Sequence, residues 1–88
     1  MYFTATTSSY PANGGTVNPT STTVEYGTNV TLVATPNLRY NFIHWTDSVG
    51  NIVSTNASFT PTIINDITYI AVFEEILTYV VYDSIFNF

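Results

Sequence analysis

The sequence predicts an all-β fold: a single small β-sandwich or β-grasp-like module of about six to eight short, mostly antiparallel strands. β-Branched and aromatic residues fill stretches that glycines and prolines separate. Val30, Leu32 and Ala34 occupy every second position, which is the pattern of a half-buried strand, whereas no stretch has the spacing of a helix. Hydrophobic residues make up 45% of the 88 residues, enough for one modest core.

The strands are predicted in order from the residues that interrupt them. Pro11 ends the first strand, and residues 12–15 form a turn, where Asn13-Gly14 tolerates the positive φ of a tight hairpin. Residues 47–51 form a hairpin loop, and Asn65 and Asp66 form another turn. Pro61 limits its strand to an edge or a turn. The predicted strands cover residues 2–10, 16–18, 22–26, 28–35, 40–45, 52–55, 59–62 and 67–73.

The predicted core gathers around one aromatic motif. Tyr40 and Phe42 share a face of their strand, but Trp45 follows three positions later and would fall on the opposite face. A bulge or a strand end near Ile43 and His44 would return Trp45 to the core. The predicted core residues are Val30, Leu32, Tyr40, Phe42, Trp45 and Phe73.

The charge of the chain argues against several classes of partner. One arginine, no lysine and six acids give a net charge of −5, so phosphate backbones would repel it and nucleic-acid binding is not expected. No apolar run approaches the ~20 residues of a membrane span, and no membrane partner is expected. Cysteine is absent, which excludes disulfides and thiolate metal sites. Sixteen threonines suit the exposed faces of strands.

The same landmarks resemble a known family. Their order is Gly-Gly-Thr-Val-x-Pro from Gly14, Tyr26-Gly27, Val-Thr-Leu-x-Ala-x-Pro from Val30, Tyr-x-Phe-x-x-Trp from Tyr40, and Ala-Val-Phe from Ala71. This order is similar to the divergent internalin-type B-repeat and to the related Listeria–Bacteroides repeats of bacterial surface proteins, over residues 2–75. The resemblance implies a non-enzymatic β-module with no shared catalytic residues, and no cofactor is expected.

Candidate sites for chemistry are few. Trp45 could stack on a sugar ring, but its place in the motif favours the core. His44 is the only histidine, and a metal site needs several ligands. Asp47 and Asp66 could meet as a pair of carboxylates, as a glycosidase requires, although any small domain offers such pairs. Glu74 and Glu75 are expected to be solvated charges, and no catalytic, cofactor or metal residue is predicted.

The C-terminal segment stands apart from the repeat pattern. We expect a module over residues 1–75 and, over residues 76–88, a strand that either completes the module's own sheet or pairs with a neighbour's sheet edge. The segment has strong β-propensity and one charge, Asp83, so something must cover it. The residues expected to anchor an interaction arm are Tyr79, Val81, Tyr82, Phe86 and Phe88.

These features predict a non-catalytic structural or interaction module displayed on a surface. The setting would be either a phage virion, as a capsid-decoration or other auxiliary structural protein, or a bacterial cell-surface repeat protein. Met1 opens directly onto a strand, which favours a complete small product. The expected partner is a protein (a virion lattice, a neighbouring subunit or an adjacent repeat), with homo-oligomers possible through the C-terminal strand. The alternative is a carbohydrate-binding module appended to a secreted enzyme, which would need at least two exposed aromatic residues on one face.

Overall fold

The computed structural model describes residues 1–76, which contain only strands, turns and loops, so the all-β prediction is confirmed. None of these residues forms a helix long and apolar enough to cross a membrane. Several strands are only two residues long, and the expected strand over residues 28–35 is divided in two, which raises the number above the six to eight predicted. The strands are β1 (Tyr2–Tyr10), β2 (Gly15–Asn18), β3 (Ser21–Glu25), β4 (Thr28–Asn29), β5 (Leu32–Pro36), β6 (Tyr40–Asp47), β7 (Ile52–Ser54), β8 (Ser58–Phe59), β9 (Thr62–Ile63) and β10 (Ile67–Glu75).

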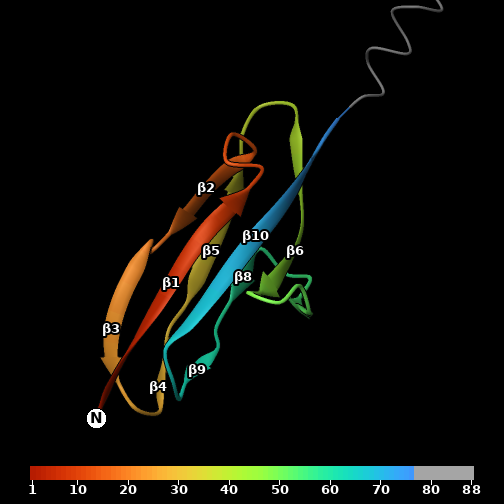
Figure 1. The fold of residues 1–88 in the computed structure, drawn as a ribbon. Helices are drawn as coiled ribbons and strands as arrows, with labels where there is room; N and C mark the ends of the chain where they lie inside the picture. The colour runs from red at the N-terminus through yellow and green to blue at the C-terminus, as the bar shows by residue number, and fades with distance from the viewer. Residues whose placement is uncertain (77–88) are drawn as a thin grey trace, which may run out of the picture.

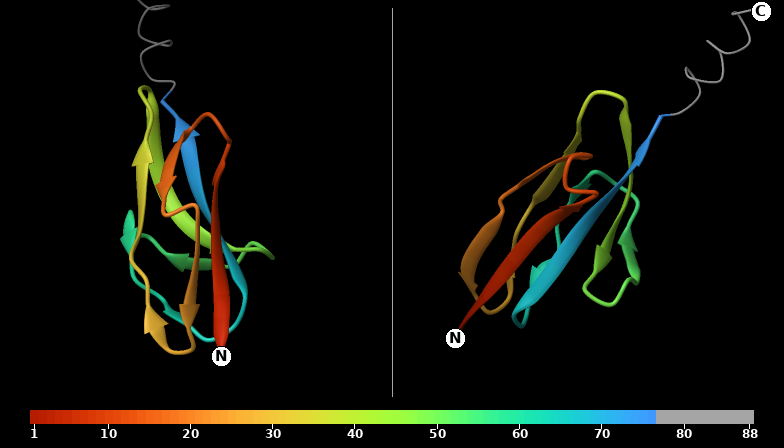
Figure 2. Two further views of the ribbon diagram at one scale, coloured as in Figure 1. Left: turned by 90° about the vertical axis from the view of Figure 1, so that its left-hand side faces the viewer. Right: turned by 45° about the horizontal axis from the view of Figure 1, so that its top comes forward.

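The strands form two layers with a small additional sheet. A five-stranded sheet has the order β3-β1-β10-β6-β7, a three-stranded sheet has the order β2-β5-β8, and β4 pairs with β9. The first and last strands, β1 and β10, pair in parallel, and every other pair is antiparallel. The larger sheet lies over β2 and β5 (Figures 1 and 2). The N-terminus and the end of β10 lie at opposite ends of the module (Figure 1).

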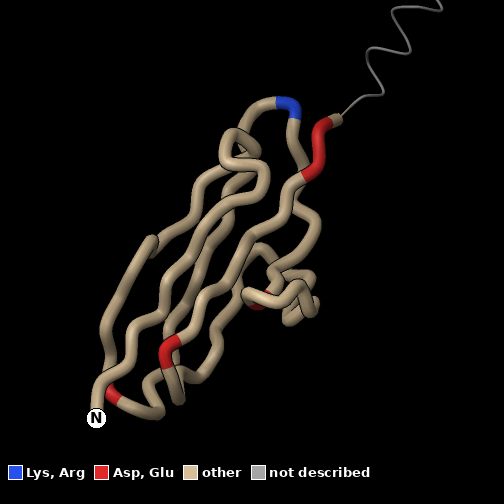
Figure 3. The backbone as a smooth tube through the Cα atoms, in the orientation of Figure 1, with Lys and Arg blue, Asp and Glu red and all other residues tan. Residues whose placement is uncertain are grey.

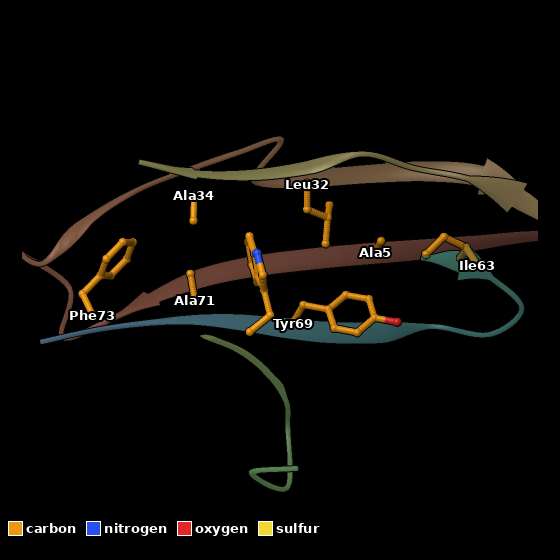
Figure 4. Packing of buried hydrophobic residues seen from close by; sticks show 8 residues of the cluster. Ala5, Leu32, Ala34, Ile63, Tyr69, Ala71 and Phe73 are labelled. Atoms are coloured by element: carbon orange, nitrogen blue, oxygen red, sulfur yellow. The ribbon is translucent and has the colours of Figure 1, made fainter. Parts of the chain in front are cut away.

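The core lies between these two layers (Figure 4). Leu32 and Ala34 project from β5 toward the facing sheet, and Ala34 lies opposite Ala71 on β10, because alternate residues of each strand face inward. The buried hydrophobic residues are Ala5, Leu32, Ala34, Trp45, Ile63, Tyr69, Ala71 and Phe73. Val30, Tyr40 and Phe42, also predicted for the core, are partly buried and pack against this cluster.

A bulge in β6 determines which of its side chains face the core. Phe42 pairs with Phe73 and His44 pairs with Val72, so Ile43 has no counterpart on β10. The extra residue shifts the alternation by one position and places Phe42 and Trp45 on the same side of the sheet. The three-residue spacing in the sequence predicted an irregularity at this point.

The turn after β1 differs from the predicted hairpin. The N–H of Gly14 donates to the carbonyl of Pro11 (2.9 Å), but β1 and β2 belong to different sheets, so the turn carries the chain from one layer to the other. Neither Gly14 nor Gly15 has a positive φ. Both are small because Phe73 lies against them: a Cβ on Gly14 would lie 2.8 Å from the Cβ of Phe73, and one on Gly15 would lie 2.5 Å from its Cζ.

Candidate functional site

Trp45 is built into the core and is closed to a surface ligand. Its side chain is 0% exposed, and its indole N–H donates to the carbonyl of Ala57 (3.1 Å). The rings of Phe42 and Phe59 lie 6.3 and 6.4 Å from it, a separation typical of packed aromatic pairs. Trp45 therefore offers no face to a sugar ring. Among residues 1–76, the exposed aromatic residues are Tyr2, Tyr10 and Tyr26.

His44 lies on the outer face of the five-stranded sheet, where it pairs with Val72 and is half-buried. Residues 1–76 contain no group of three or more histidines, cysteines or acids that could hold a metal ion. The residue paired with His44 on β10, Val72, is apolar, and within residues 1–76 no hydrogen bond from a carboxylate or hydroxyl orients His44 as a base.

Asp47 and Asp66 line one open groove of about 570 Å³, together with hydroxyl side chains of β1 and β10. Asp66 accepts a hydrogen bond from the backbone N–H of Thr4 (2.8 Å) and so ties the start of β10 to β1. The sequence placed Asp66 in a turn but did not indicate this hydrogen bond, because no local pattern reveals a partner 62 residues away. The two acids that sequence reasoning considered as a pair thus share a groove.

Asp47 has a structural role in the β6–β7 loop. Its Oδ1 accepts the backbone N–H groups of Asn51 (2.9 Å) and Val49 (3.1 Å), and the Asn51 amide donates to Oδ2 (3.2 Å). The hydrogen bond from the Asn51 N–H is the largest cause that lowers the pKa of Asp47 below its ordinary value of 3.8. A general acid of a glycosidase needs a raised pKa, so Asp47 has the opposite property.

The charged residues of the described part, residues 1–76, gather at strand ends and in loops (Figure 3). The faces of the sheets carry hydroxyl and apolar side chains instead, as the threonine-rich composition predicted. These charges are Glu25 at the end of β3, Arg39 before β6, Asp47 at the end of β6, Asp66 before β10, and Glu74 and Glu75 at its end.

The predicted interaction arm begins where the described part of the chain ends. The N–H of Ile76 donates to the carbonyl of Arg39 (2.7 Å), which continues the pairing of β10 with β6 by one residue. Tyr79, Val81, Tyr82, Phe86 and Phe88 lie outside the described residues. The division of the chain at residues 75 and 76 stays a prediction.

Sequence reasoning predicted the strand at residues 22–26 but did not identify it as a sheet edge to which another strand could be added. In the part of the chain that the structure describes, β3 is an edge of the five-stranded sheet, because β1 is its one neighbour there. The available signal was its composition: of the five residues Ser-Thr-Thr-Val-Glu, only the last is charged, and none is lysine or proline.

Comparison with known proteins agrees with this architecture. The family model of the divergent InlB B-repeat domain matches residues 5–77, which is most of the 88-residue chain. No curated protein and no solved structure matches this chain. The family consists of surface-associated repeat modules, typically of cell-surface or extracellular proteins. The resemblance expected from the sequence landmarks is confirmed, and the chain belongs to the divergent InlB B-repeat family.

Proposed function

We propose that this module is non-catalytic and acts by binding another protein through its C-terminal segment. The observation that carries the proposal is the position of β10. This strand is the central one of the five-stranded sheet, and the chain runs directly from it into residues 77–88. That segment has a single charge and is rich in tyrosine, valine and phenylalanine, so in water it needs a covering partner.

The arrangement of residues 1–76 supports a role without catalysis. The largest aromatic side chains pack in the core, and the two carboxylates of the groove accept hydrogen bonds from the protein's own backbone. The buried position of Trp45 also deprives the carbohydrate-binding alternative of the aromatic platform it was expected to use. We therefore favour protein contact over sugar binding.

The proposed setting is the exterior of a cell or a virion. In a bacterial surface protein the module would space or display other domains, and its segment would contact an adjacent repeat. In a phage virion it would attach to a protein lattice as a decoration or other auxiliary protein. The two settings require the same physical property, a segment that binds a sheet edge through main-chain hydrogen bonds.

The test is the mass in solution of the full chain and of a chain that ends at Glu75. We expect the full chain to form a larger, concentration-dependent species and the shortened chain to be a folded monomer, with the near-ultraviolet circular dichroism of Trp45 reporting the fold. If shortening the chain unfolds the module, residues 76–88 are the last strand of its own core and the interaction role is wrong. If both the full and the shortened chain are monomers, the prediction that the module binds a second copy of itself is wrong.

A further inference from the structure

We propose that the open edge of β3 is the acceptor for residues 77–88 of a second copy of this chain, which add to the five-stranded sheet as a sixth strand. This inference rests on the proposed function and names the partner and its binding site. Strand addition needs an edge whose backbone groups point outward, a length sufficient for several hydrogen bonds, and room on both faces.

The hydrogen bonds of β3 show which of its backbone groups point outward. The N–H of Thr7 donates to the carbonyl of Thr20 (2.9 Å), and the N–H of Tyr26 donates to the carbonyl of Met1 (2.8 Å). In an antiparallel pair, alternate residues face the partner strand. Residues 20, 22, 24 and 26 therefore face β1, and residues 21, 23 and 25 direct their N–H and C=O groups away from the sheet. The carbonyl of Glu25 accepts the hydroxyl of Thr28 (2.7 Å), so Ser21 and Thr23 offer both backbone groups and Glu25 offers its N–H. These groups are enough to pair with a short added strand.

The other edges are less suitable for strand addition. β7 has three residues and carries a register irregularity opposite Trp45 and Thr46. β8 has two residues and is followed closely by Pro61. β2 has four residues, and the carbonyl of Gly15 at its start accepts the hydroxyl of Ser9 (3.0 Å), which leaves fewer outward groups than β3 offers. β3 has five residues and no lysine, proline or bulge, which are the usual devices that protect an edge.

The side chains of β3 leave the edge of the core incompletely covered. Thr22 and Val24 project inward, as their pairing with Ala5 and Phe3 requires, yet both are only half-buried. Val24 packs against the core cluster with one side still accessible. A strand added outside β3 would place its own inward side chains beside Thr22 and Val24 and extend the core. Residues 79–82 of the arriving segment are Tyr-Val-Val-Tyr, which as an added strand would present apolar surface on both faces.

The length of the segment indicates a second copy and excludes full pairing within one chain. Ser21 and Thr68 both pair with Thr6, so Ser21 is level with Thr68 in the sheet. Ile76 lies eight residues beyond Thr68 along β10, a distance of about 26 Å. The position outside β3 lies three strand spacings from β10 across the sheet, a distance of about 14 Å. The combined distance, about 30 Å, needs roughly nine extended residues. Of the twelve residues from 77 to 88, only about three would remain to pair with β3.

The positions of the chain ends suit a head-to-tail assembly. β3 runs beside the start of β1, and the last residues of β10 leave at the other end of the module (Figures 1 and 2). A segment donated by one copy would meet the distant end of the next copy, a heterologous contact that leaves an acceptor and a donor open at the two ends. Such copies would add one after another, whether as separate chains or as repeats of a longer one.

The experiment uses two full-length variants that each remove one half of the contact. T23P removes an outward N–H of β3 and keeps the ladder with β1, because residue 23 does not face β1. Its matched control, T23A, loses the same hydroxyl, which contacts the hydroxyl of Thr4 (3.0 Å), but keeps the N–H. V81P interrupts the donor segment. Mass is measured by sedimentation across a concentration series, and near-ultraviolet circular dichroism confirms the fold; if T23P does not fold, S21P tests the same edge.

We expect the native chain and T23A to assemble with similar affinity, and T23P and V81P to weaken self-association at least about tenfold. Mixed together, T23P and V81P should form a one-to-one dimer, since one retains the donor and the other the acceptor. If T23P and S21P assemble like the native chain while V81P does not, β3 is not the acceptor although the interaction arm stands. In that case I52P would test the edge of β7, where the N–H of Asp47 donates to the carbonyl of Asn51 (3.0 Å), so that the next residue, Ile52, directs its N–H outward. A native chain that stays monomeric would overturn the second copy as the partner, whereas unfolding of the chain that ends at Glu75 would overturn the proposed interaction role itself.

Discussion

Replacing Gly15 with alanine is the sharpest test of how the two layers fit together. A Cβ at this position would lie 2.5 Å from the carbonyl oxygen of Thr35 and 2.5 Å from Cζ of Phe73. The phenyl ring can turn only within a packed core, and the oxygen belongs to β5, which pairs with β2 at Thr16 and Thr35. The added methyl group must therefore displace β5 within its own sheet as well as Phe73 in the facing layer.

Overpacking a core by one methyl group costs about 1–3 kcal/mol, and a clash with a backbone oxygen places G15A near the upper end. A domain of this size loses about 4–8 °C of melting temperature per kcal/mol, so we expect a decrease of roughly 10–20 °C. The assay is thermal unfolding followed by the fluorescence of Trp45, which is fully buried in the folded chain. The free energy from denaturant unfolding provides an independent value.

Two controls separate steric contact from backbone conformation. T16A changes the next, exposed residue and should alter the free energy of unfolding by less than about 0.5 kcal/mol. G50A places a methyl group where nothing lies within 4 Å but φ is +96°, so its cost should come from backbone strain alone. Adding F73L to G15A should recover part of the loss. A G15A variant as stable as the native chain would refute the packing argument for this glycine.

Three further outcomes follow from the contacts of the core and the β6–β7 loop. W45F should reduce the free energy of unfolding, measured with urea, by about 1–3 kcal/mol. It removes ring atoms from the core and the indole hydrogen bond to the carbonyl of Ala57, which still accepts the N–H of Ala34 on β5. The hydrogen bond from the N–H of Asn51 is the main cause that lowers the pKa of Asp47. The ionised Asp47 carboxylate therefore stabilises the fold above pH 3.8, and this stabilisation is lost as the pH falls through the lowered pKa. In D47N the free energy of unfolding should decrease less steeply with falling pH in this acid range. Burial is the larger cause that raises the pKa of Tyr69 above 10.0, and the negative charge of Asp47 is the second. The contribution of Tyr69 to stability is therefore present below pH 10.0 and is lost at higher pH. In D47N, an ultraviolet absorbance titration should show Tyr69 ionising at lower pH than in the native chain.

The sequence by itself determined the fold class and much of the core. Alternation along one strand placed Leu32 and Ala34 inside, and the three-residue step from Phe42 to Trp45 indicated the bulge that the structure has at Ile43. These features are local, because the side-chain period of a strand and its interruption are written in consecutive residues. The ordered landmarks also indicated the family.

Tertiary structure alone decided what depends on distant partners. The role of Gly14 and Gly15 is to make room for Phe73, a residue far along the chain, and not to supply a positive φ. Asp66 became a structural acceptor only because β1 and β10 lie side by side, and the same parallel pairing made β10 central and left β3 at an edge. The order of the strands in a sheet depends on which surfaces bury each other, and the spacing of residues within one strand does not indicate that order.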